Sequence, residues 1–276
     1  MSRLARLWLY DLAARKARIV LETPEHIEAP NWMPDGSALV VNGGGRLYRV
    51  PLAAPALELI DTGHATRLNN DHGVMPDGRR LVISNHDAQG RSTIYTLPAG
   101  GGAPVPLTDR VPSWWHGISP DGVLHAYTAV RDGRFGIYLM PDAGGPEQCL
   151  IESDHHYDGP DFSADGRHVW FNSDRSGSSE LWRIGVDGRD LQQMTDDARV
   201  NWFPHPSPDG VHLVYLAYPQ GTQGHPAGLE VELRLMPAEG GAPQVLLALH
   251  GGQGTINVPS WAPDGSRFAY VDYTRD

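Results

Sequence analysis

Two histidines and two tryptophans stand shortly before repeated turn signals. His116 follows Trp114 and Trp115 and precedes the Pro-Asp-Gly turn at residues 119–122, and His72 precedes a similar turn at residues 75–78. An imidazole can exchange a proton or bind a metal near neutral pH, and an indole offers a flat face for stacking. These residue types therefore predict a ligand or catalytic site, provided that the fold brings the segments together.

The turn signals recur along the whole chain. The turn aspartates are Asp35, Asp77, Asp121, Asp165, Asp209 and Asp264. They are separated by 42, 44, 44, 44 and 55 residues. A period in the forties in a chain rich in short β-like segments is typical of propeller blades. Four such segments fit into each period, as in a four-stranded blade.

The sequence therefore predicts an all-β fold with a single domain, a six-bladed β-propeller of four-stranded antiparallel blades. The last repeat ends early, and residues 7–12 and 17–24 match the third and fourth strand patterns. We expect these N-terminal strands to complete the last blade and remove its exposed edge. The predicted blades cover residues 27–66, 67–112, 113–155, 156–200, 201–255, and 256–276 with 4–24.

The long fifth period contains a Gly/Pro-rich insertion at residues 217–228. Its composition predicts a loop between the second and third strands of that blade, and a candidate lid.

Composition restricts the partners and the compartment. The formal net charge is −11, which argues against nucleic acid or an anionic membrane surface as a partner. Charged residues interrupt the N-terminal apolar run, and no stretch is long enough to span a membrane. The single cysteine, Cys149, excludes an internal disulfide. We expect a cytoplasmic protein.

Aligning the repeats on their aspartates produces two columns of residues before the turn. The column seven residues before the turn contains Glu28, Asn70, Trp114, Asp158, Trp202 and Asn257. The column five residues before it contains Pro30, His72, His116, Pro160, Pro204 and Pro259. Because strand side chains alternate, both columns are expected on one face of the innermost strand. They would then meet at one mouth of the central channel.

Loops between the second and third strands should reach the same mouth. The residues expected there are Asn85, His86, Arg131, Asp174, Arg175, His225 and Tyr273. Structural roles compete with functional ones: Trp32 and Trp261 are expected to pack between blades, and the turn aspartates to bond nearby backbone. For Trp114 and Trp202, packing and ligand stacking are open alternatives.

The repeat resembles a known family. The Ser-Pro-Asp-Gly motifs and the segment NSDRSGSSELW at residues 172–182 are similar to the TolB-like propellers built from PD40 repeats. The blade entries LNNDHG, SWWHG, HYDGP, NWFPHPSPDG and GGQGTIN resemble a subgroup related to oligogalacturonate lyases. TolB itself is periplasmic and carries an additional N-terminal domain. We see neither feature in this sequence and expect no Tol-system function.

The resemblance to oligogalacturonate lyases implies a carbohydrate ligand and a metal-assisted β-elimination or hydrolysis. The implied ligands of a divalent ion (Mn, Ca or Zn) are His72, His116, His205 and Gln253. The implied catalytic residues are His116, Arg131 and Asp158, and no organic cofactor is expected. The implied ligand contacts are Asn70, Asp71, Trp114, Trp115, Tyr157, Trp202, Phe203 and Asn257. Those lyases have seven blades rather than six, and His205 joins the His116 column only if a bulge shifts its register.

Two non-enzymatic functions remain open at this stage. The same mouth could bind a protein or peptide partner through its aromatic residues, with the insertion at residues 217–228 in the interface. The propeller could also be a scaffold without a ligand. The zinc-hydrolase, serine-hydrolase and phosphate-loop motifs are absent from the sequence.

Overall fold

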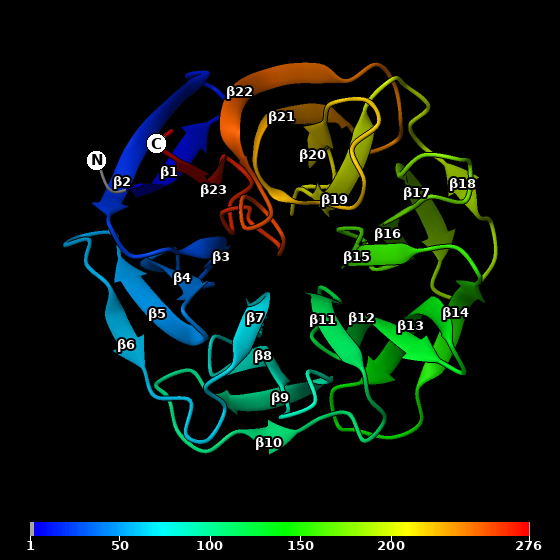
Figure 1. The fold of residues 1–276 in the computed structure, drawn as a ribbon, viewed down its shortest axis with the longest axis horizontal. Helices are drawn as coiled ribbons and strands as arrows, with labels where there is room; N and C mark the ends of the chain where they lie inside the picture. Colours follow the sequence, from blue (N-terminus) through cyan, green and yellow to red (C-terminus); the bar gives the residue numbers. More distant parts are fainter. Residues whose placement is uncertain (1–2, 276) are drawn as a thin grey trace.

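Six antiparallel sheets surround a central channel, as Figure 1 shows in a view along the channel axis. The computed structural model describes residues 3–275. Each of the first five blades is a four-stranded sheet formed by consecutive strands of the chain. The predicted all-β, six-bladed propeller is therefore confirmed.

The strands are numbered in chain order, and the first strand of each of blades 1 to 5 lies closest to the channel. Blade 1 consists of β3 (Glu28–Trp32), β4 (Ala38–Gly43), β5 (Arg46–Pro51) and β6 (Glu58–Ile60). Blade 2 consists of β7 (Leu68–Val74), β8 (Arg80–His86), β9 (Ser92–Pro98) and β10 (Val105–Pro106). Blade 3 consists of β11 (Ser113–Ile118), β12 (Leu124–Arg131), β13 (Arg134–Pro141) and β14 (Gln148–Ser153). Blade 4 consists of β15 (Tyr157–Phe162), β16 (His168–Ser173), β17 (Glu180–Gly185) and β18 (Gln192–Gln193). Blade 5 consists of β19 (Val200–Pro206), β20 (His212–Tyr218), β21 (Ala227–Pro237) and β22 (Gln244–Gly252).

The two ends of the chain close blade 6. Its sheet contains β23 (Arg267–Tyr273), β1 (Ala5–Asp11) and β2 (Lys16–Thr23), and the chain ends lie side by side in Figure 1. An ion pair from Arg6 Nη2 to Asp272 Oδ2, 2.7 Å long, reinforces the closure. The predicted N-terminal completion is confirmed. The innermost strand of this blade is reduced to one bridge, Trp261 to Phe268.

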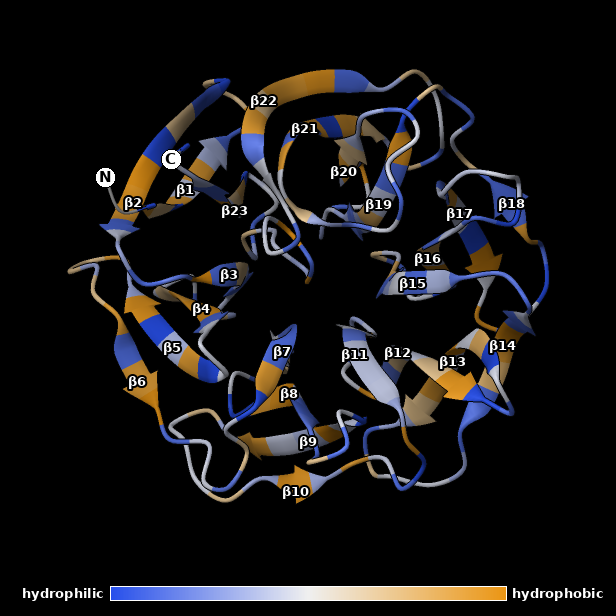
Figure 2. Cartoon of the chain, in the orientation of Figure 1, coloured by the Kyte–Doolittle hydropathy of each residue, from blue (hydrophilic) through white to orange (hydrophobic). Residues whose placement is uncertain are grey.

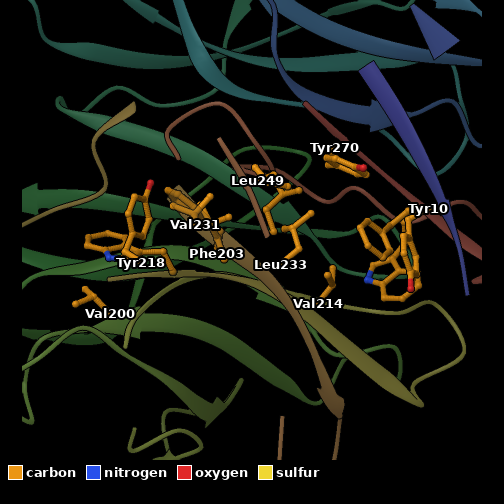
Figure 3. Packing of buried hydrophobic residues seen from close by; sticks show 14 residues of the cluster. Tyr10, Val200, Phe203, Val214, Tyr218, Val231, Leu233, Leu249 and Tyr270 are labelled. Atoms are coloured by element: carbon orange, nitrogen blue, oxygen red, sulfur yellow. The ribbon is translucent and has the colours of Figure 1, made fainter. Parts of the chain in front are cut away.

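Apolar side chains from neighbouring blades form the core. Figure 2 shows hydrophobic residues concentrated in the strands, while the connecting loops are mostly hydrophilic. The cluster in Figure 3 joins Tyr10 and Tyr270 of blade 6 to Val214 and Leu233 of blade 5. Because each blade buries its faces against its neighbours, ring closure stabilises every sheet at once. Trp32 and Trp261 are 5% and 7% exposed and pack in such clusters, as predicted.

The Asp-Gly turns are held by their own side chains. In the turn of blade 4, Asp165 Oδ1 accepts hydrogen bonds from Ser163 Oγ at 2.6 Å and from the backbone N–H of Arg167 at 3.0 Å. Gly166 follows with a φ of 69°, which favours glycine. The turn aspartates are therefore structural residues at the end of the ring opposite the predicted site.

The innermost strands of blades 1 to 5 are all interrupted by bulges, which the column analysis did not include. In β11 the register shifts between Trp115 and Gly117, so His116 is the unpaired residue. In β7 the shift lies between Leu68 and His72. An inserted residue changes which side chains face the channel. The expectation that positions seven and five before the turn share one face therefore fails in most blades.

Candidate functional site

A cavity of about 350 Å³ lies at the mouth of the channel, at the end opposite the Asp-Gly turns. Its walls come from all blades except the first. The lining residues are Asn69, Asn70, Asp71, His86, Trp114, His116, Thr128, Phe135, His156, Asp158, Phe203, His225, Gln253 and Asn257. A volume of this size is typical of small-molecule sites. A cavity therefore lies at the mouth where the site was predicted, and some of the predicted residues line it.

His116 lies between two carboxylates at the base of the cavity. Its Nε2 is 3.0 Å from Asp158 Oδ1 and 4.0 Å from Asp71 Oδ1. His116 is 3% exposed, so these charges interact with little screening by water. Thr128 Oγ1 and the backbone N–H of Gly159 also donate to Asp158 Oδ1, at 3.1 and 2.9 Å. Side chains from blades 2, 3 and 4 thus meet in one network.

The protonation states follow from this arrangement. Burial lowers the pKa of His116, but attraction to Asp71 and Asp158 outweighs it and raises the pKa to about 9. Burial raises the pKa of Asp71 to about 6, although His116 opposes this shift. For Asp158, burial acts upward, yet its contacts with His116 hold the pKa well below the usual range. At neutral pH the site contains a protonated His116 paired with an ionised Asp158.

The insertion in blade 5 delivers a second histidine. The loop between β20 and β21 places His225 Nε2 3.5 Å from Asp158 Oδ2. The other ring nitrogen of His225 forms a short hydrogen bond with Gln253 Oε1, which also accepts from Asn257 Nδ2 at 3.0 Å. Burial lowers the pKa of His225, but the hydrogen bond and charge of Asp158 raise it overall. The loop was predicted between these strands, and its histidine completes the site.

Six aromatic and imidazole rings form a continuous row along this mouth, which we call the aromatic row. Its members in spatial order are Trp114, Phe135, His156, Trp202, His225 and Phe203. Successive ring centroids are 6.4, 4.6, 5.7, 4.5 and 5.2 Å apart. Trp114 and Phe135 are nearly parallel, with 16° between their planes, and both are half-buried. Trp114, Phe135, His156 and His225 form the accessible part of the row, because Trp202 and Phe203 are buried.

Phe203 occupies an unusual backbone position in this row. Its φ is 56°, a conformation that a bulky residue seldom adopts. The bulge of β19 imposes it, and the backbone N–H of Phe203 donates to Asn172 Oδ1 at 3.1 Å. Strained backbone that the surroundings maintain is concentrated at functional sites. This conformation turns the Phe203 ring into the cavity wall.

His72 and His205, the other histidines of the predicted metal set, lie outside the cavity. His72 is in the bulged region of β7, where Asp71 faces the cavity instead, and its Nε2 is 3.3 Å from the carbonyl oxygen of Val40. Burial lowers the pKa of His72 to about 4, so it is neutral. The bulge proposed for the His205 segment is present, but the His205 nitrogens bond Asp161 and the carbonyl of Ile256.

The predicted donor set does not fit a divalent ion. Both nitrogens of His205 are engaged, at 2.9 Å from Asp161 Oδ2 and 2.6 Å from the Ile256 oxygen. His116 is paired with Asp158, and its raised pKa opposes the neutral form that a metal requires. Within residues 3–275, no group of three or more His, Cys, Asp or Glu side chains is arranged to hold a metal ion.

Arg131, one of the implied catalytic residues, forms an ion pair away from the cavity. Its guanidinium forms two bonds to Glu147, Nε to Oε1 at 2.8 Å and Nη2 to Oε2 at 2.7 Å. It also donates to the carbonyl of Pro112 and to Ser113 Oγ. Arg131 does not line the cavity, because its blade buries it as a permanently charged structural partner.

Three of the predicted ligand contacts are packing residues. Trp115 is 1% exposed, packs against Gly73 and donates from Nε1 to His125 Nδ1 at 3.0 Å. Tyr157 is also 1% exposed and bonds Ser153 through its hydroxyl. Trp202 is 4% exposed and belongs to the core, with one edge on a second cavity. Asn70, Asp71, Trp114, Phe203 and Asn257 line the mouth cavity as predicted.

Several residues that line the cavity were missing from the predicted ligand set. Asn69, Thr128, Phe135 and His156 line the cavity, and none belongs to either aligned column. Phe135 and His156 lie just inside or before strands β13 and β15. The presence of polar and aromatic residues at every blade entry was the only sequence signal, and it did not distinguish these positions from ordinary loop residues.

Asp174 and Arg175, which were both expected near the mouth, have different partners. Asp174 Oδ1 accepts from the backbone N–H of His156 at 2.9 Å. The Arg175 guanidinium lies over the Trp182 ring, 5.0 Å from its centroid. The two side chains therefore stabilise different loops.

Comparisons with known proteins place the chain. The PD40 profile, described as TolB beta propeller domain, matches residues 109–232. A protein of uncharacterised function from Agrobacterium fabrum is 47% identical over 266 residues, covering 96% of this chain and 91% of the relative. A solved TolB-type structure from Agrobacterium tumefaciens is 46% identical, with full coverage of both chains and a TM-score of 0.98.

More distant structures share the fold alone. TolB from Acinetobacter baumannii is 19% identical to this chain, with a TM-score of 0.71. The match covers 91% of this chain and 65% of the Acinetobacter protein. An oligogalacturonate lyase in complex with manganese is 14% identical, with coverages of 82% and 66% and a TM-score of 0.57.

Proposed function

The chain belongs to the TolB-like family of six-bladed β-propellers, and we propose that it binds a carbohydrate-type ligand at the mouth of its central channel. One observation carries this proposal. The mouth cavity combines a half-buried aromatic face, Trp114 on Phe135, with the hydrogen-bonding groups of Asp71, His116 and Asp158. Sugar rings present an apolar face and a rim of hydroxyl groups, so both features have a partner in one ligand.

The amides of the cavity extend this recognition. Asn70, Gln253 and Asn257 line the wall, and each carries both a donor and an acceptor. Asn257 Nδ2 donates to Gln253 Oε1, and Asn257 Oδ1 accepts from the backbone N–H of Gly254, which fixes the orientation of both amides. A hydroxyl group can donate to one such amide and accept from another. Pre-oriented groups of this kind reduce the entropy lost on binding.

An enzymatic form of this proposal uses His116 as the proton donor. Its protonated ring, stabilised by Asp158, faces the cavity and can donate to a ligand oxygen. Asp71, with a pKa of about 6, is ionised at neutral pH and can accept a proton. We derive no step through a metal, because the predicted donors do not fit one. A sugar hydrolase or lyase activity therefore depends on this acid–base pair.

The test measures binding and turnover separately. Purified protein is applied to an array of neutral and uronic glycans, and hits are confirmed by isothermal titration calorimetry. Trp114→Ala is expected to weaken binding at least tenfold, whereas Trp182→Ala, a half-buried tryptophan of blade 4 outside both cavities, is the matched control. His116→Gln is expected to abolish any turnover while retaining part of the affinity. Absence of binding to every glycan class contradicts the proposal.

A second candidate is a protein- or peptide-binding module. The exposed loop between β20 and β21 contributes Gln220 to His225 to a cavity of about 560 Å³ beside the mouth. An exposed loop next to aromatic residues can anchor a partner. Pull-down with the wild type and with a variant whose residues 219–224 are replaced by a short Gly-Ser turn tests it. Equal recovery of partners by both proteins excludes this loop from an interface.

We also propose a cytoplasmic location. The free thiol of Cys149 is exposed, which suits a reducing compartment. Residues 3–275 contain no helix long and apolar enough to cross a membrane. Cell fractionation with an antibody against the chain tests this location, and recovery in the periplasmic fraction contradicts it.

A further inference from the structure

A second cavity adjoins the mouth cavity. Its volume is about 560 Å³, and it lies between the loops of blades 4 and 5. His156 and His225 line both cavities, so the two spaces meet at these rings. Ser178, Ser179 and Thr222 supply hydroxyl groups on the far wall. We refer to these two adjoining cavities, which share the His156 and His225 side chains, as the path.

The aromatic row runs along this path. Trp114 and Phe135 lie in the mouth cavity, His156 and His225 at the junction, and Trp202 in the second cavity. The Trp202 and His225 centroids are only 4.5 Å apart. A ligand of one sugar unit needs a single stacking surface. A row of rings along two joined cavities suits a chain of several units.

Among the described residues, the charged side chains that line the path include carboxylates but no lysine or arginine. Of the four histidines that line the cavities, His116 and His225 already contact Asp158 at 3.0 and 3.5 Å. Asp71 and Asp174 add further carboxylates. A polyanionic ligand would meet these carboxylates without a lysine or arginine partner, which costs binding energy.

We propose that the two cavities are consecutive subsites for an elongated, uncharged oligosaccharide of at least two sugar units. The inference rests on the proposed function and specifies its ligand. Trp114 and Phe135 hold one unit against the His116–Asp158 network. The half-buried rings of His156 and His225, with the hydroxyl groups of the second cavity, hold the next. The ligand class also separates this site from lyases of uronic acid chains, because a neutral sugar lacks the carboxyl group next to which β-elimination occurs.

Calorimetry with ligands of defined length and charge tests the proposal. The probes are glucose, cello- and malto-oligosaccharides and galacto-oligosaccharides of one to four units, with oligogalacturonates of equal length. We expect at least tenfold tighter binding of two or more neutral units than of one. Oligogalacturonates are expected to bind at least tenfold more weakly than the best neutral chain.

Two variants test whether the second cavity causes the increase in affinity with chain length. Ala198→Trp fills this cavity from an exposed position. It should lower the affinity for longer chains to the affinity for a single sugar unit. Ala54→Trp, at an exposed position of blade 1, is the matched control and should change neither affinity. Gln220→Arg places a cation on the path and should strengthen binding of oligogalacturonates.

The outcomes distinguish the two levels of the proposal. If single units bind and chain length or Ala198→Trp has no effect, the second cavity is not a subsite, while the proposed function stands. If oligogalacturonates bind as tightly as neutral chains, the assignment to an uncharged ligand is wrong. If none of the probes binds, the proposed function itself fails.

Discussion

Blade 3 holds two buried histidines with opposite protonation behaviour. His116 at the channel mouth contacts Asp158 and Asp71, and its pKa is raised to about 9. His125 lies near the turn end of the same blade, with Nε2 3.0 Å from Asp142 Oδ1. Burial lowers the pKa of His125, although Asp142 opposes the shift. Each histidine has a carboxylate at the same distance, so that contact alone does not decide its charge.

The other neighbours make the difference. Arg80 binds both oxygens of Asp142, at 3.0 and 2.7 Å, and neutralises the carboxylate that His125 contacts. His125 Nδ1 also accepts a hydrogen bond from Trp115, which requires that nitrogen to be unprotonated. At the mouth, a second carboxylate takes the place of the arginine. The imidazole of a buried His–Asp pair is thus neutral when the carboxylate is otherwise neutralised, and charged when it is not.

The largest expected effect is on the free energy of unfolding, when the carboxylate of Asp158 or of Asp142 is removed. Asp158→Ala leaves a buried charged imidazole and two donors without their acceptor, so we expect a loss of about 3–5 kcal/mol of unfolding free energy. Asp142→Ala leaves a neutral His125 and an Arg80 that reaches solvent, so we expect a loss of about 1–3 kcal/mol. Urea unfolding at pH 7 measures both. An equal or larger loss for Asp142→Ala contradicts the comparison.

The next effect is a dependence of stability on pH. Because the folded-state pKa of His116 is about 9 and the ordinary value is 6.5, its contribution is fully present below pH 6.5 and is lost as the pH rises through 9. We expect a loss of about 3 kcal/mol over this window. His116→Gln should remove that dependence. The free energy of unfolding of the two proteins is measured between pH 6.5 and 9.5. If it changes with pH by the same amount in both, the prediction is wrong.

A smaller effect is expected on His125. Arg80→Met removes the positive charge that keeps Asp142 neutralised and that lowers the pKa of His125. The pKa of His125 should therefore rise in this variant. Imidazole NMR shifts followed against pH measure the change, and Arg91→Met, which removes an exposed pair with Asp87, is the control. An unchanged His125 titration means that Arg80 does not set its charge.

The smallest effect on stability is expected from Asp71→Asn. The substitution removes one attraction to His116 and also the cost of burying a second carboxylate, and these contributions offset each other to within about 1 kcal/mol at pH 7. The pKa of His116 should fall, because Asp71 is one of the two charges that raise it. NMR titration of His116 beside a urea unfolding curve measures both quantities. A large stability loss without a pKa change would assign Asp71 a structural role.

Repeated motifs allowed most of the fold to be predicted. The six Asp-Gly turns determine their own local geometry through side-chain contacts such as those of Asp165, so their spacing counts the blades. The short last repeat and the matching N-terminal segments predict closure, which the pairing of β1 with β23 confirms. Local turn chemistry and strand alternation act over a few residues, and a sequence displays both directly.

The site was only partly predictable, because bulges and distant neighbours decide it. Strict alternation put His72 and His116 on one face, yet the bulge of β7 lies before His72 and presents Asp71 to the cavity, whereas in β11 His116 is itself the unpaired residue. The resemblance implied that Arg131 is catalytic, and its place near a loop predicted that it reaches the mouth. In the structure Arg131 pairs with Glu147, which directly precedes β14. Neither register shifts nor ion-pair choices are readable from residue spacing.

The sequence by itself determined a closed ring of six blades with histidines, tryptophans and carboxylates gathered at one mouth, because these features depend on local turns and on a repeat period. The tertiary structure alone decided which of these residues face the cavity and what charge they hold. The reason is that the charge of His116 depends on Asp71 and Asp158, which come from two other blades and meet it only after the ring has closed.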